Sequence, residues 1–317
     1  MKKILLATVA VVILASCSNN ESEMLKNPAN EIKFTNLNDR VTRVANDAGD
    51  DYQVYAELTT SASAWYINDV IDGTLNTAAA GPYYWPAGSA TLDFFSYAPA
   101  GTTNATVSDT HPTLSITYTV PTTADEDFTV ATPLVGLDEN AGSGLDGTAE
   151  FQFEHMLSKI TVRVSLKTPE LSAYDLDLTN ATADLVVDNN TGTLNAKATA
   201  PAFGSITGGT TTYSGDSIYM IMPQALSTTT TLQIKDVIIT KNGVNYYVGD
   251  LKLYEFTGSE IPGGAFAKGT HYVFNFEITK VSSDDNGDPL FGPEIKFSAD
   301  VTGWTTGVLS TDPIPQP

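Results

Sequence analysis

Strict alternation of apolar and polar residues is the feature that most constrains the fold of this chain. Four stretches show it clearly, at residues 114–120, 160–166, 272–278 and 295–301. In the second of these, the apolar and polar sets alternate as Ile160, Val162, Val164 and Leu166 against Thr161, Arg163 and Ser165. A period of two is typical of strands with one buried and one wet face. No segment has a long, capped pattern of period 3.6, so the sequence predicts an all-β fold built of sandwiches.

Turn-forming residues separate the alternating stretches. Residues 189–192, 241–243 and 284–287 each combine Asn, Asp or Lys with a glycine and favour tight hairpin turns. Residues 200–215 are rich in glycine and threonine and are predicted to form a flexible loop. These signals divide the chain into many short strands.

The length of 317 residues allows two ordinary domains. Thr168-Pro169 interrupts the second alternating stretch, since proline ends a strand. We therefore predict an N-terminal β-sandwich domain over residues 31–168 and a C-terminal one over residues 169–317.

The N-terminus has the organisation of an export signal. Two lysines precede an apolar run at residues 4–15, which is too short to span a bilayer. The run ends in Leu14-Ala15-Ser16-Cys17, which resembles a bacterial lipobox, and Cys17 is the only cysteine. The resemblance implies a signal peptide at residues 1–16, lipidation of Cys17, and a polar tether at residues 17–30. A plain secretory peptide with an incidental cysteine explains the position of Cys17 less well.

The charge balance restricts the classes of partner. The chain has 37 acidic and 16 basic residues, a formal net charge of −21. Such a charge argues against nucleic acid as a partner. An acidic, solvated surface is sufficient to explain it. With one cysteine there is no intramolecular disulfide, so stability must come from packing of the core.

The sequence shows no constellation typical of an enzyme. Its three histidines have no second histidine or cysteine at the spacing of a zinc site, and no nucleophile-elbow or phosphate-loop motif is present. We predict no catalytic residue, no metal and no cofactor. The carboxylates of residues 125–127 are expected to be solvated, and the acidic segment 284–288 to be a turn rather than a calcium loop. The aromatic residues of segments 83–85 and 94–97 are expected in the core.

Several motifs, in order along the chain, resemble those of the Bacteroidales fimbrillin family. The matching segments are Glu31-Ile32-Lys33-Phe34 with Thr42-Arg43, Tyr83-Tyr84-Trp85-Pro86 with the aromatic run up to Pro99, Phe153-Glu154-His155-Met156-Leu157-Ser158-Lys159-Ile160, Met222-Pro223-Gln224, Gly269-Thr270-His271-Tyr272, and Val301-Thr302-Gly303-Trp304. Together they span nearly the whole chain behind the lipobox.

The resemblance implies a type V pilus subunit made of two tandem transthyretin-like β-sandwich domains. It implies an outer-membrane lipoprotein on the cell surface, from which an arginine-specific protease removes an N-terminal arm after Arg43 or Arg40. The arm residues Ile32, Phe34 and Leu37 would then leave a groove for a strand of another subunit. The segment after Arg43 lacks the Trp and Gly-Asp pair common in the family, which leaves the start of the mature core open.

Two functions follow as hypotheses. The first is a fimbrial subunit, in the stalk or at the tip as an accessory, that serves adhesion. The second is a monomeric surface lipoprotein that binds a glycan or a host or bacterial surface ligand without polymerising. Residues 305–317 contain Pro313, Pro315 and Pro317 and make a poor donor strand, because proline lacks the N–H for a ladder hydrogen bond. This tail favours a tip or accessory role, or a donor strand formed by residues 295–304.

Overall fold

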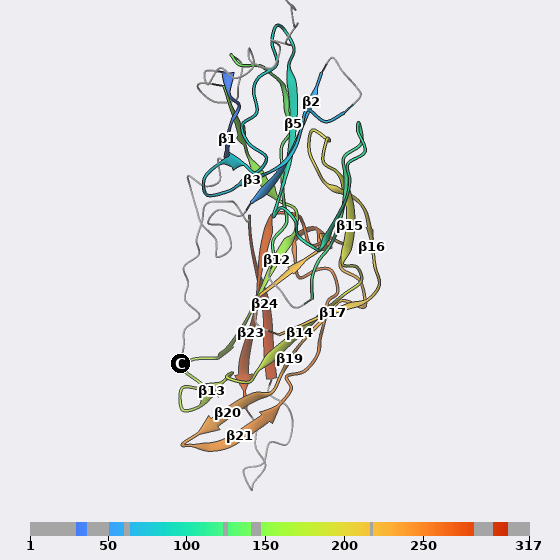
Figure 1. The fold of residues 1–317 in the computed structure, drawn as a ribbon. Helices are drawn as coiled ribbons and strands as arrows, with labels where there is room; N and C mark the ends of the chain where they lie inside the picture. Colours follow the sequence, from blue (N-terminus) through green and yellow to red (C-terminus); the bar gives the residue numbers. More distant parts are fainter. Residues whose placement is uncertain are drawn as a thin grey trace, which may run out of the picture.

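The chain is an elongated assembly of β-sheets (Figure 1). A computed structural model describes residues 30–36, 51–59, 64–122, 126–140, 147–215, 218–281 and 294–303. Regular structure in these residues is almost entirely β-strand, with a short 3-10 helix, η3 (Pro262–Gly264). The predicted all-β fold is confirmed.

A seven-stranded sheet forms one end of the molecule (Figure 1). Its strands, in spatial order, are β11 (Phe153–His155), β8 (Thr129–Ala131), β5 (Leu92–Ala98), β2 (Tyr52–Leu58), β3 (Ile67–Asp72) and β4 (Thr77–Ala78), with β9 (Leu134–Leu137) also pairing with β5. A separate parallel pair, β1 (Lys33–Asn36) and β10 (Thr148–Phe151), packs on it through a shared apolar core.

A four-stranded sheet combines strands from both halves of the sequence. It consists of β6 (Ala105–Ser108), β7 (Ser115–Thr119), β15 (Thr191–Asn195) and β16 (Phe203–Thr207), in the order β16-β15-β7-β6. We call it the hydroxyl sheet, because its strands are rich in serine and threonine. The central pairing of β7 with β15 is antiparallel and joins residues more than 70 positions apart.

Two further four-stranded sheets face each other in the lower part of Figure 1 and form the lower sandwich. One sheet has the order β18 (Ile218–Ile221), β12 (Ser158–Leu166), β23 (Thr270–Lys280) and β24 (Glu294–Gly303). The other has the order β17 (Thr211–Gly215), β14 (Thr182–Val187), β19 (Thr231–Lys235) and β22 (Tyr254–Glu255). Ring contacts join the two, such as Tyr254 stacked on Phe297 with centroids 4.0 Å apart.

A small three-stranded sheet lies at the far end, beyond the lower sandwich (Figure 1). It contains β13 (Asp175–Asp177), β20 (Val237–Lys241) and β21 (Val244–Gly249). β20 and β21 form the hairpin predicted at residues 241–243, where Asn242 and Gly243 have φ of 52° and 74°. Positive φ at both turn residues is what a tight hairpin of this kind requires.

Two sequence predictions about local structure are wrong. Residues 189–192 do not close a hairpin, because β14 pairs with β17 and β19 while β15 pairs with β7 and β16. Residues 200–215 are not a loop, because they contain β16 and β17. Asn and Gly suggested the hairpin and the glycine and threonine content suggested the loop, whereas pairing with distant strands determines both conformations.

The predicted domain boundary at Thr168-Pro169 lies just after β12. That strand runs parallel to β23 over nine residue pairs, from Ser158 with Thr270 to Leu166 with Ile278. β12 therefore belongs to the lower sandwich by its hydrogen bonding, although it precedes the boundary in sequence. The division into residues 31–168 and 169–317 stays a prediction.

An ion cluster ties the seven-stranded sheet to the hydroxyl sheet. Lys197, two residues after β15, places Nζ at 2.6 and 2.7 Å from the two carboxylate oxygens of Glu57 in β2, and it also donates to the carbonyl of Pro112. Nε2 of His111 lies 2.9 Å from Oε2 of Glu57. The Glu57 side chain is only 14% exposed, so its charge depends on these partners.

Replacing Glu57 by Gln is expected to lower the free energy of unfolding by about 1–3 kcal/mol, because the ammonium group of Lys197 would lose its anionic partner in a half-buried position. Urea denaturation measures this. The matched control is Glu170→Gln, which breaks an exposed pair with Lys167 and should give no measurable change. Equal effects of the two variants would contradict a structural role for the cluster.

His271 lies on β23, and its Nε2 is 2.8 Å from Oγ1 of Thr161 on the neighbouring strand β12. Burial, together with the nearby charges of Lys159 and Arg163, lowers its pKa from 6.5 to about 4. Between these two pH values the unfolded chain binds a proton at this histidine and the folded chain does not. The free energy of unfolding therefore falls as the pH falls from about 6.5 to about 4.

In the His271→Gln variant the free energy of unfolding should fall less steeply between pH 6.5 and pH 4, since glutamine does not titrate. The measurement is urea denaturation of the wild type and the variant at several pH values from 7 down to 4. Carboxylates contribute to both profiles equally, so the difference between them isolates His271. Parallel profiles would show that His271 titrates alike in the folded and unfolded chain.

Candidate functional site

The N-terminal arm, residues 30–36, is held by backbone hydrogen bonds on both sides. On one side β1 pairs in parallel with β10, from Lys33 with Thr148 to Asn36 with Phe151. On the other side the N–H of Ile32 donates to the carbonyl of Tyr83 at 2.8 Å, and the N–H of Trp85 donates to the carbonyl of Asn30 at 2.9 Å. The arm is therefore hydrogen-bonded to two separate segments of the body, through residues 30–32 to segment 83–85 and through residues 33–36 to β10.

The side chains of the arm alternate between core and surface. Ile32 and Phe34 are 3% and 5% exposed, whereas Lys33 between them points to solvent. The two apolar side chains join a core cluster that also contains Tyr52, Val54, Ala56, Ile67, Ile71, Trp85, Leu92, Phe94, Ala131, Ala149, Phe151 and Phe153. Burial of an Ile or Phe side chain stabilises by about 1.5–3 kcal/mol each, so these two residues are the main anchors of the arm.

Aromatic rings line the site beneath the arm. Trp85 lies edge-on to Phe94 with centroids 5.7 Å apart, and its Nε1 donates to the carbonyl of Gly147 at 3.1 Å. Gly147 has φ of +68°, and a Cβ there would approach Trp85 Nε1 to 2.9 Å. A glycine is therefore needed immediately before β10, because any larger residue would collide with the Trp85 ring. Trp85, Phe94, Phe95 and Tyr97 are buried in the core, as predicted, whereas Tyr83 and Tyr84 are only partly buried.

The partners of the arm could not be identified from the sequence. Segment 83–85 and β10 lie far apart along the chain, and β10 pairs in parallel, which leaves no local turn signal. The alternation of buried Ala149 and Phe151 with Thr148 and Glu150 was the only available indication of a strand.

The other predicted site residues lie outside the described residues. These are Cys17, Leu37, Arg40 and Arg43, together with the acidic segment 284–288. Their roles stay predictions. Among the described residues, no group of three or more His, Cys, Asp or Glu is arranged to hold a metal ion.

The expectation that the carboxylates of residues 125–127 are solvated is wrong for the two that are described. Oε1 of Glu126 accepts hydrogen bonds from Thr102, Asn104 and the hydroxyl of Tyr118 at 2.7–3.1 Å. Oδ2 of Asp127 lies 2.5 Å from Nδ1 of His155. Burial and the neighbouring Glu126 raise the pKa of Tyr118 well above its usual value. These carboxylates serve as structural hydrogen-bond acceptors beside the core.

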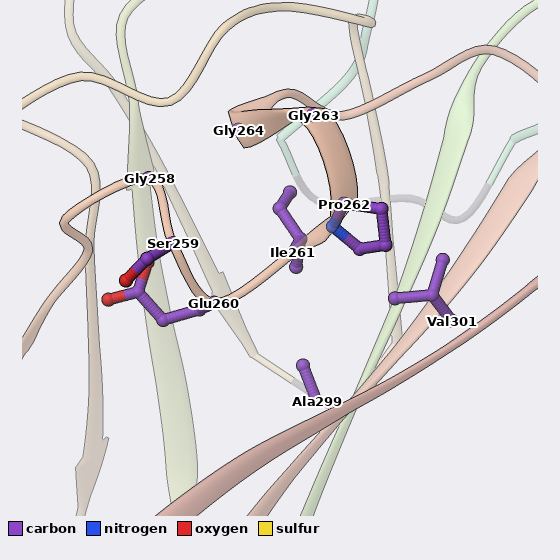
Figure 2. A pocket seen from close by; sticks show the side chains of 9 residues that line it. All are labelled: Gly258, Ser259, Glu260, Ile261, Pro262, Gly263, Gly264, Ala299 and Val301. Carbon is purple, nitrogen blue, oxygen red and sulfur yellow. The ribbon is translucent and has the colours of Figure 1, made fainter.

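A shallow hollow of about 820 Å³ lies between the segment 258–264 and the last strand (Figure 2). Its apolar lining comes from Ile261 and Pro262 on the loop and from Ala299 and Val301 on β24. The carboxylate of Glu260 is occupied by the backbone N–H and hydroxyl of Thr257. Ala299 and Val301 of β24 are only partly buried beside the hollow.

The sequence model of the fimbrillin-like family matches residues 40–304. The chain belongs to the fimbrillin-like family. A second model, that of the prokaryotic membrane lipoprotein lipid attachment site, matches residues 1–18. No curated protein matches the sequence. The predicted membership of the fimbrillin family is thus confirmed.

Solved structures show the same fimbrillin-like fold at low sequence identity. A fimbrial protein from Bacteroides vulgatus aligns with a TM-score of 0.59 and 14% identity over 87% of this chain and 100% of its own. A fimbrilin from Porphyromonas gingivalis aligns with a TM-score of 0.51 and 9% identity over 88% and 98% of the two chains. At these identities the likeness shows the fold.

No helix among the described residues is long and apolar enough to cross a membrane.

Replacing Phe34 by Ala is expected to lower the free energy needed to open the arm by about 3 kcal/mol, because the substitution leaves a cavity in the core beneath it. Amide hydrogen exchange of residues 32–36 measures local opening of the arm directly. The matched control is Lys33→Ala on the outer face of the same strand, which should leave exchange unchanged. Similar exchange in both variants would show that the backbone hydrogen bonds alone hold the arm.

Proposed function

We propose that this fimbrillin-like protein is a subunit of a surface fimbria and that subunits join by strand exchange at the arm site. One observation carries the proposal: the arm pairs as a strand with its own body, hydrogen-bonded to β10 and to segment 83–85 and anchored by Ile32 and Phe34. Lipidation at Cys17 would attach the protein to the outer membrane, and the fimbria would serve adhesion.

Removal of the arm would leave two kinds of unsatisfied surface. The backbone groups of β10 and of segment 83–85 would lose their partners, and the aromatic core beneath would face water. A strand from another subunit with apolar residues at the positions of Ile32 and Phe34 would restore both. This is strand addition, in which backbone hydrogen bonds contribute affinity and side-chain pockets contribute specificity.

The position of the two arginines suits removal of the arm by a protease. Arg40 and Arg43 belong to the segment 37–50, which connects the arm to Asp51 and β2. Cleavage at either would break the covalent link, and only the hydrogen bonds and the two buried side chains would then hold the arm. The arm would become exchangeable without unfolding of the body.

β24 is the donor strand that we favour among the described segments. It lies at the edge of its sheet, pairs only with β23, and keeps Ala299 and Val301 partly uncovered beside the hollow. The three prolines near the C-terminus make the tail after Gly303 a poorer donor. The same prolines favour a second candidate function, a tip or accessory subunit that accepts a strand but donates none.

Treatment of the non-lipidated protein (Ser18 onward) with an arginine-specific protease should cut only after Arg40 or Arg43. The third arginine, Arg163, lies within β12, where the backbone pairs with β23, and it should resist cleavage in the folded protein. Intact mass identifies the cut. Size-exclusion chromatography should then show growth of higher oligomers over time.

Two controls separate the possible explanations. The Arg40→Lys/Arg43→Lys variant should remain uncut and monomeric under the same treatment. A synthetic peptide of residues 30–37 in excess should refill the site and block growth, whereas the same peptide with Ala at position 34 should not. A cut protein that stays monomeric would refute a polymerising stalk subunit and leave the tip or monomeric binding function.

A further inference from the structure

The outer face of the hydroxyl sheet is made entirely of small polar side chains. On each of its strands these alternate with residues that point to the core, as Thr117 does with buried Ile116 and Tyr118. The outward residues form three rows across the sheet: Ser108, Ser115 and Asn195; then Thr106, Thr117, Thr193 and Ser205; then Thr119, Thr191 and Thr207. We call this surface the hydroxyl face.

The rows follow the pairing of the four strands, which is continuous except for an irregularity between β15 and β16 at Thr193 and Leu194. Oγ1 of Thr117 lies 2.8 Å from Oγ1 of Thr193, and Oγ1 of Thr119 lies 3.0 Å from Oγ1 of Thr191. Neighbouring strands are about 4.7–4.9 Å apart, and alternate residues on one strand about 6.6 Å apart. Hydroxyl and methyl groups therefore recur along the three rows of the face.

The face is also free of charge in a strongly acidic chain. None of the four strands contains Asp, Glu, Lys, Arg or His, although the chain has a net charge of −21. The outer face of the neighbouring sheet of the lower sandwich differs, since its strands contain Arg163, Glu277, Lys296 and Asp300. Exposed strand faces in this protein are thus not neutral as a rule.

We propose that the hydroxyl face binds an uncharged, extended polysaccharide. Each Ser or Thr hydroxyl can both donate and accept, and it rotates to suit its partner, which matches the mixed donor and acceptor character of sugar hydroxyls. Threonine methyl groups offer apolar contact to the C–H groups of a sugar ring. The spacing between strands is close to the length of one pyranose unit in an extended chain, so successive sugars can meet successive rows.

The features of the face select against other partners. An anionic polysaccharide finds no cation there and approaches a molecule of net negative charge. Stable protein interfaces need an apolar centre with large side chains. The large exposed apolar residues of the described chain, including Leu75, Val135, Val244 and Val248, all lie outside the four strands. A second copy of the chain is therefore a poorer occupant than a neutral sugar chain.

The test is depletion of the non-lipidated protein (Ser18 onward) from solution by particles of cellulose, chitin and mannan, with immobilised polygalacturonate as the anionic comparison. Wild type should be retained by at least one neutral polysaccharide and not by polygalacturonate. Thr117→Val/Thr193→Val removes two paired hydroxyls while keeping shape and strand propensity, so the fold should persist. It should weaken retention at least tenfold.

A matched control changes the same chemistry on another sheet. Ser298→Ala/Thr302→Val alters the outer face of β24 and should leave retention unchanged. The proposal is refuted if no neutral polysaccharide retains the wild type, if polygalacturonate retains it equally, or if both double variants bind as the wild type does. Dimerisation of the wild type that Thr193→Lys abolishes, detected by sedimentation, would instead assign the face to a second copy. None of these outcomes depends on cleavage or exchange of the arm.

Discussion

The insertion of Ile32 and Phe34 into the aromatic core is the interaction on which the seven-stranded end of this molecule depends. Without the arm, β10 has no strand partner among the described residues, and rings such as Trp85 and Phe151 lose their cover. A segment close to the N-terminus supplies β1, which pairs with β10 and completes the apolar core that this pair shares with the seven-stranded sheet. A strand position filled from the end of a chain is one that another chain can fill, since backbone hydrogen bonds do not discriminate between the two sources.

The remainder of the structure keeps that end attached to a continuous body. The larger core cluster contains residues of the seven-stranded sheet, such as Tyr55 and Phe95, together with residues of the lower sandwich, such as Ile160 and Phe274. The ion pair of Glu57 with Lys197 joins the seven-stranded sheet to the hydroxyl sheet, in which β7 pairs with β15. This larger cluster does not contain Ile32 or Phe34, which belong to the smaller cluster, so loss of the arm would leave the larger core intact.

Local pattern in the sequence predicted the strands well and their partners poorly. The alternation at residues 160–166 and 272–278 identified β12 and β23 and their buried faces, because side-chain direction in a strand follows from its period alone. These two strands pair in parallel although they lie more than 100 positions apart in the sequence, and neither segment contains a pattern that indicates its partner. The same limit explains the error over β16 and β17, whose glycine and threonine residues form strands only because β15 and β14 provide partners. Likewise, the roles of Glu126 and Asp127 depend on Thr102 and His155, which only the fold brings near.

The arm site and the hydroxyl face use different residues and different physical chemistry. The arm site depends on apolar burial with backbone pairing, which favours a long-lived junction once water is excluded. The hydroxyl face offers many equivalent, exposed hydrogen-bonding groups, each of which exchanges a bond to water for a bond of similar strength. Contacts of that kind become firm only when many form together, as on a repetitive polymer or when many copies of the face are displayed. A fimbria would supply such copies, so assembly at the first site would make weak binding at the second effective.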